Sequence, residues 1–106
     1  EEMDIHNARQ QKNHVCFHVD VRNAFADTVQ WGFRDVFRQH HPEPDQYTFF
    51  DYRTPNAAGR RMGWRIDHLL ATPSLARRCT DAYIDLEPRL QSKPSDHTFL
   101  VGEFDL

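Results

Sequence analysis

The chain has little cysteine and no long apolar run, and each shortage excludes a class of protein. Its two cysteines, Cys16 and Cys79, lie far apart and neither belongs to a Cys-x-x-Cys pair, so a disulfide framework and a zinc knuckle are excluded. No stretch approaches the roughly 18 apolar residues that a membrane-spanning helix needs, and the charged start Glu1–Asp4 is unlike a signal peptide. We therefore expect a cytoplasmic protein with no membrane partner.

Positive charge is also scarce. The 13 lysines and arginines are outnumbered by 16 acidic residues, which gives a formal net charge of -3. Because nucleic-acid binders usually carry a basic excess, any phosphate-binding surface of this chain has to be local. Only Lys12 and Lys93 are lysines; the many arginines suit phosphate recognition, but without a motif a compositional bias is the favoured explanation.

What the chain does contain is enough for one small domain of mixed α and β structure. It has 106 residues, 39% of them hydrophobic. Asp20 is placed to cap a helix in which Val21, Phe25 and Val29 share one face, ending near Trp31-Gly32. We predict a loop or arm over residues 1–13, a weak strand over 14–20, a long-looped hairpin from strands 47–52 and 64–70, a short helix opened by Thr72-Pro73, and strands over 82–86 and 98–104.

Two segments carry candidate catalytic groups. Ser95-Asp96-His97 enters an apolar run, and an imidazole beside a carboxylate suits acid–base chemistry or metal binding. The alternative is a turn with a surface histidine. Asp67 lies in an apolar strand and needs a hydrogen-bond donor; that donor is either a histidine or a simple partner such as Arg65 or the backbone.

A third set of polar side chains alternates along the weak strand pattern. His14, Cys16, His18 and Asp20 would share one face of such a strand and could meet at a zinc or copper ion. No second ligand cluster closes that site, so an exposed polar edge is the favoured interpretation.

Six motifs in one order closely resemble a known family. They are Asp4–Asn7, Gly32–Arg38, His41-Pro42, Tyr47–Arg53, Gly63–Ala71 and Lys93–His97. Together they resemble the C-terminal half of the exodeoxyribonuclease III family of abasic-site DNA endonucleases, within the endonuclease/exonuclease/phosphatase superfamily. The resemblance implies an α/β (α+β) fold in which residues 1–106 form one half of a four-layer sandwich of mostly antiparallel sheet with flanking helices.

The resemblance also implies roles for individual residues. His97 corresponds to the active-site histidine beside the scissile phosphate, Asp67 to the carboxylate that orients it, and Asp96 to the acidic residue next to the metal. Family members cleave DNA 5′ to an abasic site and remove nucleotides from 3′ ends, with Mg²⁺ or Mn²⁺ as cofactor. Four further positions resemble substrate contacts: Phe49 and Trp64 against the flipped abasic sugar, and Arg60 and Arg61 in a DNA-contacting loop.

Several family groups are absent from the chain. No Gly-Asp-x-Asn motif is present, and the metal-binding glutamate and catalytic tyrosine of the N-terminal half are missing. Because Mg²⁺ prefers six oxygen ligands, Asp96 alone is not expected to hold it tightly. We expect this chain to be inactive without the N-terminal lobe; the alternative is a non-catalytic half-domain that self-associates or contacts DNA.

The missing half also predicts an association surface. One sheet of a sandwich buries its inner face against the other, so this chain is expected to expose Val101, Leu69 and Phe49. The N-terminal lobe or a second copy in a homodimer would cover that face. Acting on DNA, the intact protein is expected to be associated with the nucleoid.

Overall fold

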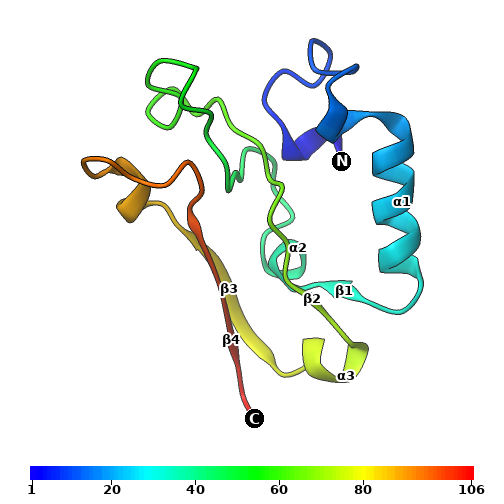
Figure 1. The fold of residues 1–106 in the computed structure, drawn as a ribbon. Helices are drawn as coiled ribbons and strands as arrows, with labels where there is room; N and C mark the ends of the chain where they lie inside the picture. The colour runs from blue at the N-terminus through cyan, green and yellow to red at the C-terminus, as the bar shows by residue number, and fades with distance from the viewer.

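Two small antiparallel sheets contain all of the regular strands. The computed structural model describes all 106 residues, and in it β1 (Arg34–Asp35) pairs with β2 (Leu70–Ala71) while β3 (Cys79–Asp85) pairs with β4 (Phe99–Phe104). The β3–β4 ribbon lies on one side of the molecule and α1 (Val19–Gln30) on the other, with β1, β2 and α2 (Val36–His40) between them (Figure 1). The remaining elements are α3 (Pro73–Ala76) and the 3-10 helices Glu2–Asp4, Val15–Phe17 and Glu87–Leu90. This arrangement confirms the mixed α/β class with antiparallel sheet and flanking helices.

Helix α1 is confirmed, although its cap is one the sequence did not indicate. The N-cap residue is His18 and not Asp20. Nδ1 of the His18 imidazole accepts a hydrogen bond from the backbone amide of Asp20 at 3.1 Å. The helix ends at Gln30, two residues before Gly32, whose φ of 149° is a conformation that side chains disfavour. No residue of α1 is buried. On the predicted apolar face, Phe25 and Val29 are partly buried, and the ring of Phe25 lies 4.4 Å from that of His68.

The predicted strand over residues 14–20 is wrong. Val15–Phe17 forms a 3-10 helix, and the imidazole of His14 caps it by accepting the amide of Cys16 at 3.1 Å. The two histidines of this segment are therefore local caps, a use of side chains that competes with strand pairing. No group of three or more histidine, cysteine, aspartate or glutamate side chains able to hold a metal ion exists in the molecule, so the alternating set does not form a metal site.

The predicted hairpin is present only in outline. Phe49 and Trp64 form an isolated antiparallel bridge, and regular pairing on the second segment is limited to β2. Not every backbone amide of the second segment donates to the first one. The amide of Arg65, for example, donates to the carbonyl of Asp4 at 2.6 Å. The ladder that period-two alternation predicts is replaced by these irregular bonds.

The later elements agree closely with the sequence. Thr72 caps α3 with its hydroxyl oxygen, and Pro73 occupies the first turn. The strands predicted over 82–86 and 98–104 correspond to β3 and β4, in which Ala82 is opposite Gly102. None of the helices is long and apolar enough to cross a membrane.

The interior is divided into three small clusters, one of which incorporates the N-terminal segment. Ile5 is buried against Phe17 and Trp64 and bridges the latter, and Asp4 is also buried. Residues 1–13 are therefore not a free arm. The other two clusters are Tyr47, Phe50, Ala57 and Ala58, and Val36, Ala71 and Ala76.

The three apolar residues expected to be exposed are all partly buried. Leu69 packs against the cluster around Val36, and Phe49 packs against the cluster around Ile5. The expectation was wrong because α2 and the N-terminal segment cover that region. Exposed apolar side chains occur instead at positions such as Val19, which is 55% exposed, and Phe99, which is 61% exposed.

Candidate active site

His97 and Asp67 form a hydrogen-bonded pair. Nδ1 of His97 lies 2.8 Å from Oδ2 of Asp67, although the residues are 30 positions apart. An ionised carboxylate can only accept, so Nδ1 carries the proton and Nε2 is left free to act on another group. Of the partners that the sequence allowed for Asp67, the structure contains the histidine and not Arg65.

Three short extended segments bring this pair together. Residues 48–50 lie in the middle, with Phe49 bridged to Trp64 on one side and to His97 on the other. The amide of Phe50 donates to the carbonyl of Asp96 at 2.8 Å, which fixes the loop that carries His97. The pair therefore depends on contacts between distant parts of the chain.

The two aromatic candidates have different environments. The ring of Phe49 lies 5.2 Å from the ring of His97, centroid to centroid, and is only partly buried. Trp64 is 9% exposed because Ile5 and Phe17 pack on it and the ring of His14 lies 4.6 Å away. Phe49 thus lies beside the His97–Asp67 pair, whereas Trp64 is largely covered.

Asp96 does not form a metal site with other residues of this chain. Its backbone carbonyl is used in the bond to Phe50, and its side chain is partly exposed. Because no cluster of three or more potential ligands exists, the residues present do not fit a resident divalent ion by themselves.

Arg60 and Arg61 lie on the exposed loop between the two bridged segments. Arg60 donates from Nη1 to the carbonyl of Pro55 at 3.3 Å, and Arg61 donates from Nη2 to the carbonyl of Asp45 at 2.9 Å. Neither makes a hydrogen bond or ion pair with His97 or Asp67. Both guanidinium groups therefore support their own loop and remain open to solvent.

A buried charge network that the sequence did not indicate is centred on Arg65, two positions before Asp67. Arg65 Nε contacts Oδ1 of Asp4 at 2.6 Å, and Arg65 Nη1 contacts Oδ2 of Asp35 at 2.8 Å. Arg38 also binds Asp4. An arginine between Trp64 and Ile66 was the available signal, but its partners Asp4 and Asp35 are 61 and 30 residues away along the chain.

The network lowers the pKa values of both carboxyl groups. Burial alone raises the pKa of Asp35, but the nearby imidazole of His68, 3.8 Å away, and the charge of Arg65 outweigh it and lower the pKa to about 2. Burial likewise opposes ionisation of Asp4, and the hydrogen bond and charge of Arg65 again lower its pKa. Both groups are therefore ionised at neutral pH, as the ion pairs require.

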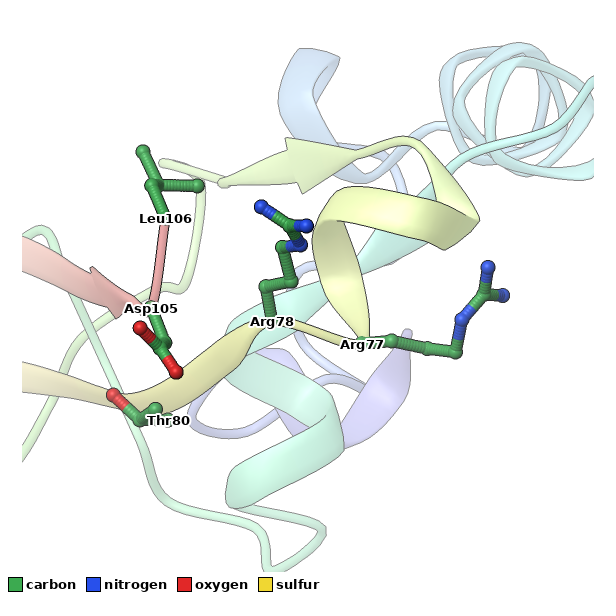
Figure 2. A pocket seen from close by; sticks show the side chains of 5 residues that line it. All are labelled: Arg77, Arg78, Thr80, Asp105 and Leu106. Carbon is green, nitrogen blue, oxygen red and sulfur yellow. The ribbon is translucent and has the colours of Figure 1, made fainter.

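A further pocket lies at the end of the β3–β4 ribbon, with a volume of about 320 Å³. Arg77, Arg78, Thr80, Asp105 and Leu106 line it (Figure 2). Figure 2 shows Arg77 and Arg78 pointing away from each other, with the Asp105 carboxylate beside Thr80. The two guanidinium groups do not converge on a common point, so the pocket lacks the geometry of an anion site.

Solved structures similar to this chain are DNA-processing enzymes. An AP endonuclease from Archaeoglobus fulgidus is 52% identical with a TM-score of 0.96, and the match covers 100% of this chain and 41% of that one. A 3′ phosphatase from Neisseria, solved with a product DNA hairpin, is 35% identical with a TM-score of 0.95, and the match again covers 100% and 41%. The fold is thus that of the matching part of the AP endonucleases and related nucleases.

The chain belongs to the endonuclease/exonuclease/phosphatase family, whose pattern matches residues 8–97. Among curated relatives, exodeoxyribonuclease III of Haemophilus influenzae is 43% identical over 75 residues, which are 70% of this chain and 28% of that protein. The chain therefore spans less than half the length of the relatives it matches.

Proposed function

We propose that residues 1–106 are the C-terminal half of an endonuclease/exonuclease/phosphatase domain, and that the intact protein is a metal-dependent DNA-repair phosphodiesterase. Its activity would be that of an abasic-site endonuclease or a 3′–5′ exodeoxyribonuclease. The His97–Asp67 pair carries the proposal, because a 2.8 Å bond between residues 30 positions apart leaves Nε2 free at an open surface.

In this proposal His97 contacts the scissile phosphate through Nε2. Asp67 holds the ring by accepting from Nδ1, which fixes the tautomer and stabilises the imidazolium. The ring of Phe49, 5.2 Å from that of His97, supplies an apolar wall for the abasic sugar. Trp64 would form the second wall with the part of its ring that stays exposed.

Arg60 and Arg61 are the proposed DNA-backbone contacts. Both are exposed, and a guanidinium fork suits phosphate oxygens. Their bonds to loop carbonyls leave further N–H groups of each guanidinium available, since arginine has five donors. Neutralising a few phosphates would make DNA binding by the intact protein dependent on salt.

The chain alone is proposed to be inactive. Asp96 would stand next to a Mg²⁺ or Mn²⁺ ion in the complete enzyme, but the remaining ligands would come from an N-terminal lobe that these 106 residues do not contain. When bound, that metal would supply charge stabilisation at the phosphate. The proposed location is the cytoplasm, with nucleoid association when the intact protein acts on DNA.

A groove beside α1 is the proposed docking site of the N-terminal lobe. It has a volume of about 790 Å³, and its lining includes Val21, Phe25 and Val29 of α1 and Ile66 opposite. Phe25 lies against the ring of His68, 4.4 Å between centroids, but none of these α1 side chains is fully buried. An apolar face of this kind is normally covered.

A hybrid protein tests the enzymatic proposal. The N-terminal part of the Archaeoglobus fulgidus AP endonuclease, joined to this chain in place of its own matching segment, should cleave an abasic-site duplex with added Mg²⁺. His97→Ala in the hybrid should lower the rate by about 10²- to 10⁴-fold, the usual contribution of a positioned acid–base group. A folded hybrid without activity, or one that is indifferent to His97→Ala, would contradict the proposal.

The groove also favours a second candidate function, that of a non-catalytic half-domain. In that case a second copy of the chain would cover the α1 face, giving a homodimer that contacts DNA without cleaving it. Sedimentation of the 106-residue chain distinguishes the two: a concentration-dependent dimer together with an inactive hybrid supports this alternative. A chain that stays monomeric at high concentration would exclude the homodimer alternative.

A further inference from the structure

Thr48 is fully buried between the segments that carry His97 and Asp67. Its hydroxyl oxygen accepts hydrogen bonds from two consecutive amides, those of Ile66 at 3.1 Å and Asp67 at 3.2 Å. The same hydroxyl donates to the carbonyl of Trp64 at 3.4 Å. A hydroxyl has one donor and two acceptor positions, so all three are in use here.

The backbone of Thr48 is bonded to the other half of the pair. Its carbonyl accepts the amide of Thr98, the residue after His97, at 2.7 Å, and its amide donates to Trp64 at 2.9 Å. A single residue therefore connects the backbone at Asp67 with the backbone next to His97. No other side chain in the molecule is hydrogen-bonded to the amide of Asp67.

We propose that Thr48 is a positioning residue for the His97–Asp67 pair. The hydroxyl of Thr48 fixes the backbone at Asp67, and thereby keeps the Asp67 carboxylate within hydrogen-bond distance of Nδ1 of His97. The pair needs this support because its side chains are 38% and 40% exposed, so water competes for both partners. The catalytic consequence rests on the proposed function, whereas the geometric role does not.

Nitrogen NMR of histidine-labelled chain tests the proposal. At alkaline pH, where imidazole rings are neutral, the wild-type spectrum should show His97 protonated at Nδ1; its signals are identified by their loss in His97→Gln. Thr48→Val has nearly the same shape but leaves the two amides without an acceptor. We expect it to lose the Nδ1–H preference, with both nitrogen signals moving toward averaged positions, and we expect Thr48→Ser to keep the wild-type spectrum.

Two further variants keep the test decisive. Val36→Ala, at another fully buried position in a separate cluster, should lower stability without changing the His97 signals. If Thr48→Val does not fold, Thr48→Ala replaces it, because the vacated space admits a water to the amides while the fixed hydroxyl is still lost. A folded Thr48→Val or Thr48→Ala chain with the wild-type His97 spectrum overturns the proposal, as does a Val36→Ala spectrum that changes equally.

This experiment separates the two proposals. The NMR signature reports the geometry of the pair and needs neither metal nor DNA. An inactive hybrid with a Thr48-dependent spectrum would remove the proposed function and leave the positioning role. An active hybrid in which Thr48→Val leaves the His97 tautomer unchanged would remove the positioning role and leave the proposed function.

Discussion

Arg65 joins three parts of the chain through one guanidinium group. It is 3% exposed at its side chain and pairs with Asp4 from the N-terminal segment and with Asp35 at the start of α2. Buried charges are costly unless they are paired and hydrogen-bonded, and here each partner has a second bond. The pairing fixes the segment on which Trp64 and Asp67 lie.

The same network predicts acid sensitivity. The folded-state pKa of Asp35, about 2, lies below its ordinary value of 3.8. A lowered pKa contributes stability above the ordinary value, and that contribution is lost as the pH falls from about 4 to about 2. From the size of the shift, the loss attributable to Asp35 is about 2 kcal/mol.

Asp35→Asn isolates this effect. Asparagine keeps the helix cap that Asp35 provides to the amide of Arg38 but cannot be ionised, so urea unfolding of the variant should depend less on pH across that window. Asp27→Asn, at an exposed α1 position without an ion pair, is the matched control and should behave as wild type. An Asp35→Asn chain that loses stability as steeply as wild type would contradict the assignment.

At the scale of elements, the close approach of residues 47–50 to Gly63 and Trp64 replaces a regular hairpin. A Cβ at Gly63 would lie 2.7 Å from Cβ of Tyr47 and 2.8 Å from the carbonyl oxygen of Phe49. These are distances that no side chain tolerates without backbone movement. Glycine is therefore required where the two segments meet at the candidate site.

Gly63→Ala should destabilise the chain by about 1 to 3 kcal/mol, the usual cost of overpacking. It should also separate Phe49 from Trp64. Equilibrium urea unfolding measures the first effect. Gly59→Ala is the control from the same loop, because the atoms nearest its Cβ would all belong to the side chain of Asn56, which is exposed. Equal losses in both variants would refute the argument.

The sequence predicted elements well where local signals were sufficient. Helix α1, helix α3 and the strands β3 and β4 followed from periodicity, capping and β-branched residues, whereas the pairing of β3 with β4 came only from the structure. The prediction failed at residues 14–17, because the alternation there belongs to a 3-10 helix whose end is capped by an imidazole. It failed again between residues 65 and 69, where the amides bond to Thr48 and Asp4 instead of to a neighbouring strand.

At the scale of the whole molecule, α1 is packed only loosely against the rest of the chain. It has no buried residue, and its groove-facing side chains include Val21, which is 47% exposed. Most of the contacts that would normally stabilise such a helix are absent from this chain. The free energy of unfolding should therefore depend little on its apolar face.

Val21→Glu tests this point. In the chain alone it should change stability by no more than about 0.5 kcal/mol, as at an ordinary surface position. With a separately expressed N-terminal part of the Archaeoglobus fulgidus relative, the same change should weaken association at least tenfold, because a carboxylate would be buried in an apolar groove. Thr28→Glu, on α1 but outside the groove, should leave association unchanged; equal weakening by both would remove the groove as the docking face.

The sequence by itself determined the class of fold, the local elements and the set of candidate groups. Those depend on residue type and short-range spacing: His97 follows Asp96, Asp67 lies in an apolar segment, and the order of motifs resembles one family. The tertiary structure decided which groups meet. Whether Asp67 pairs with His97 or Arg65, and where the Arg65 charge is neutralised, depends on contacts between residues 30 and 61 positions apart. Neither helical nor strand periodicity carries information over such separations, since both describe only neighbours along the chain.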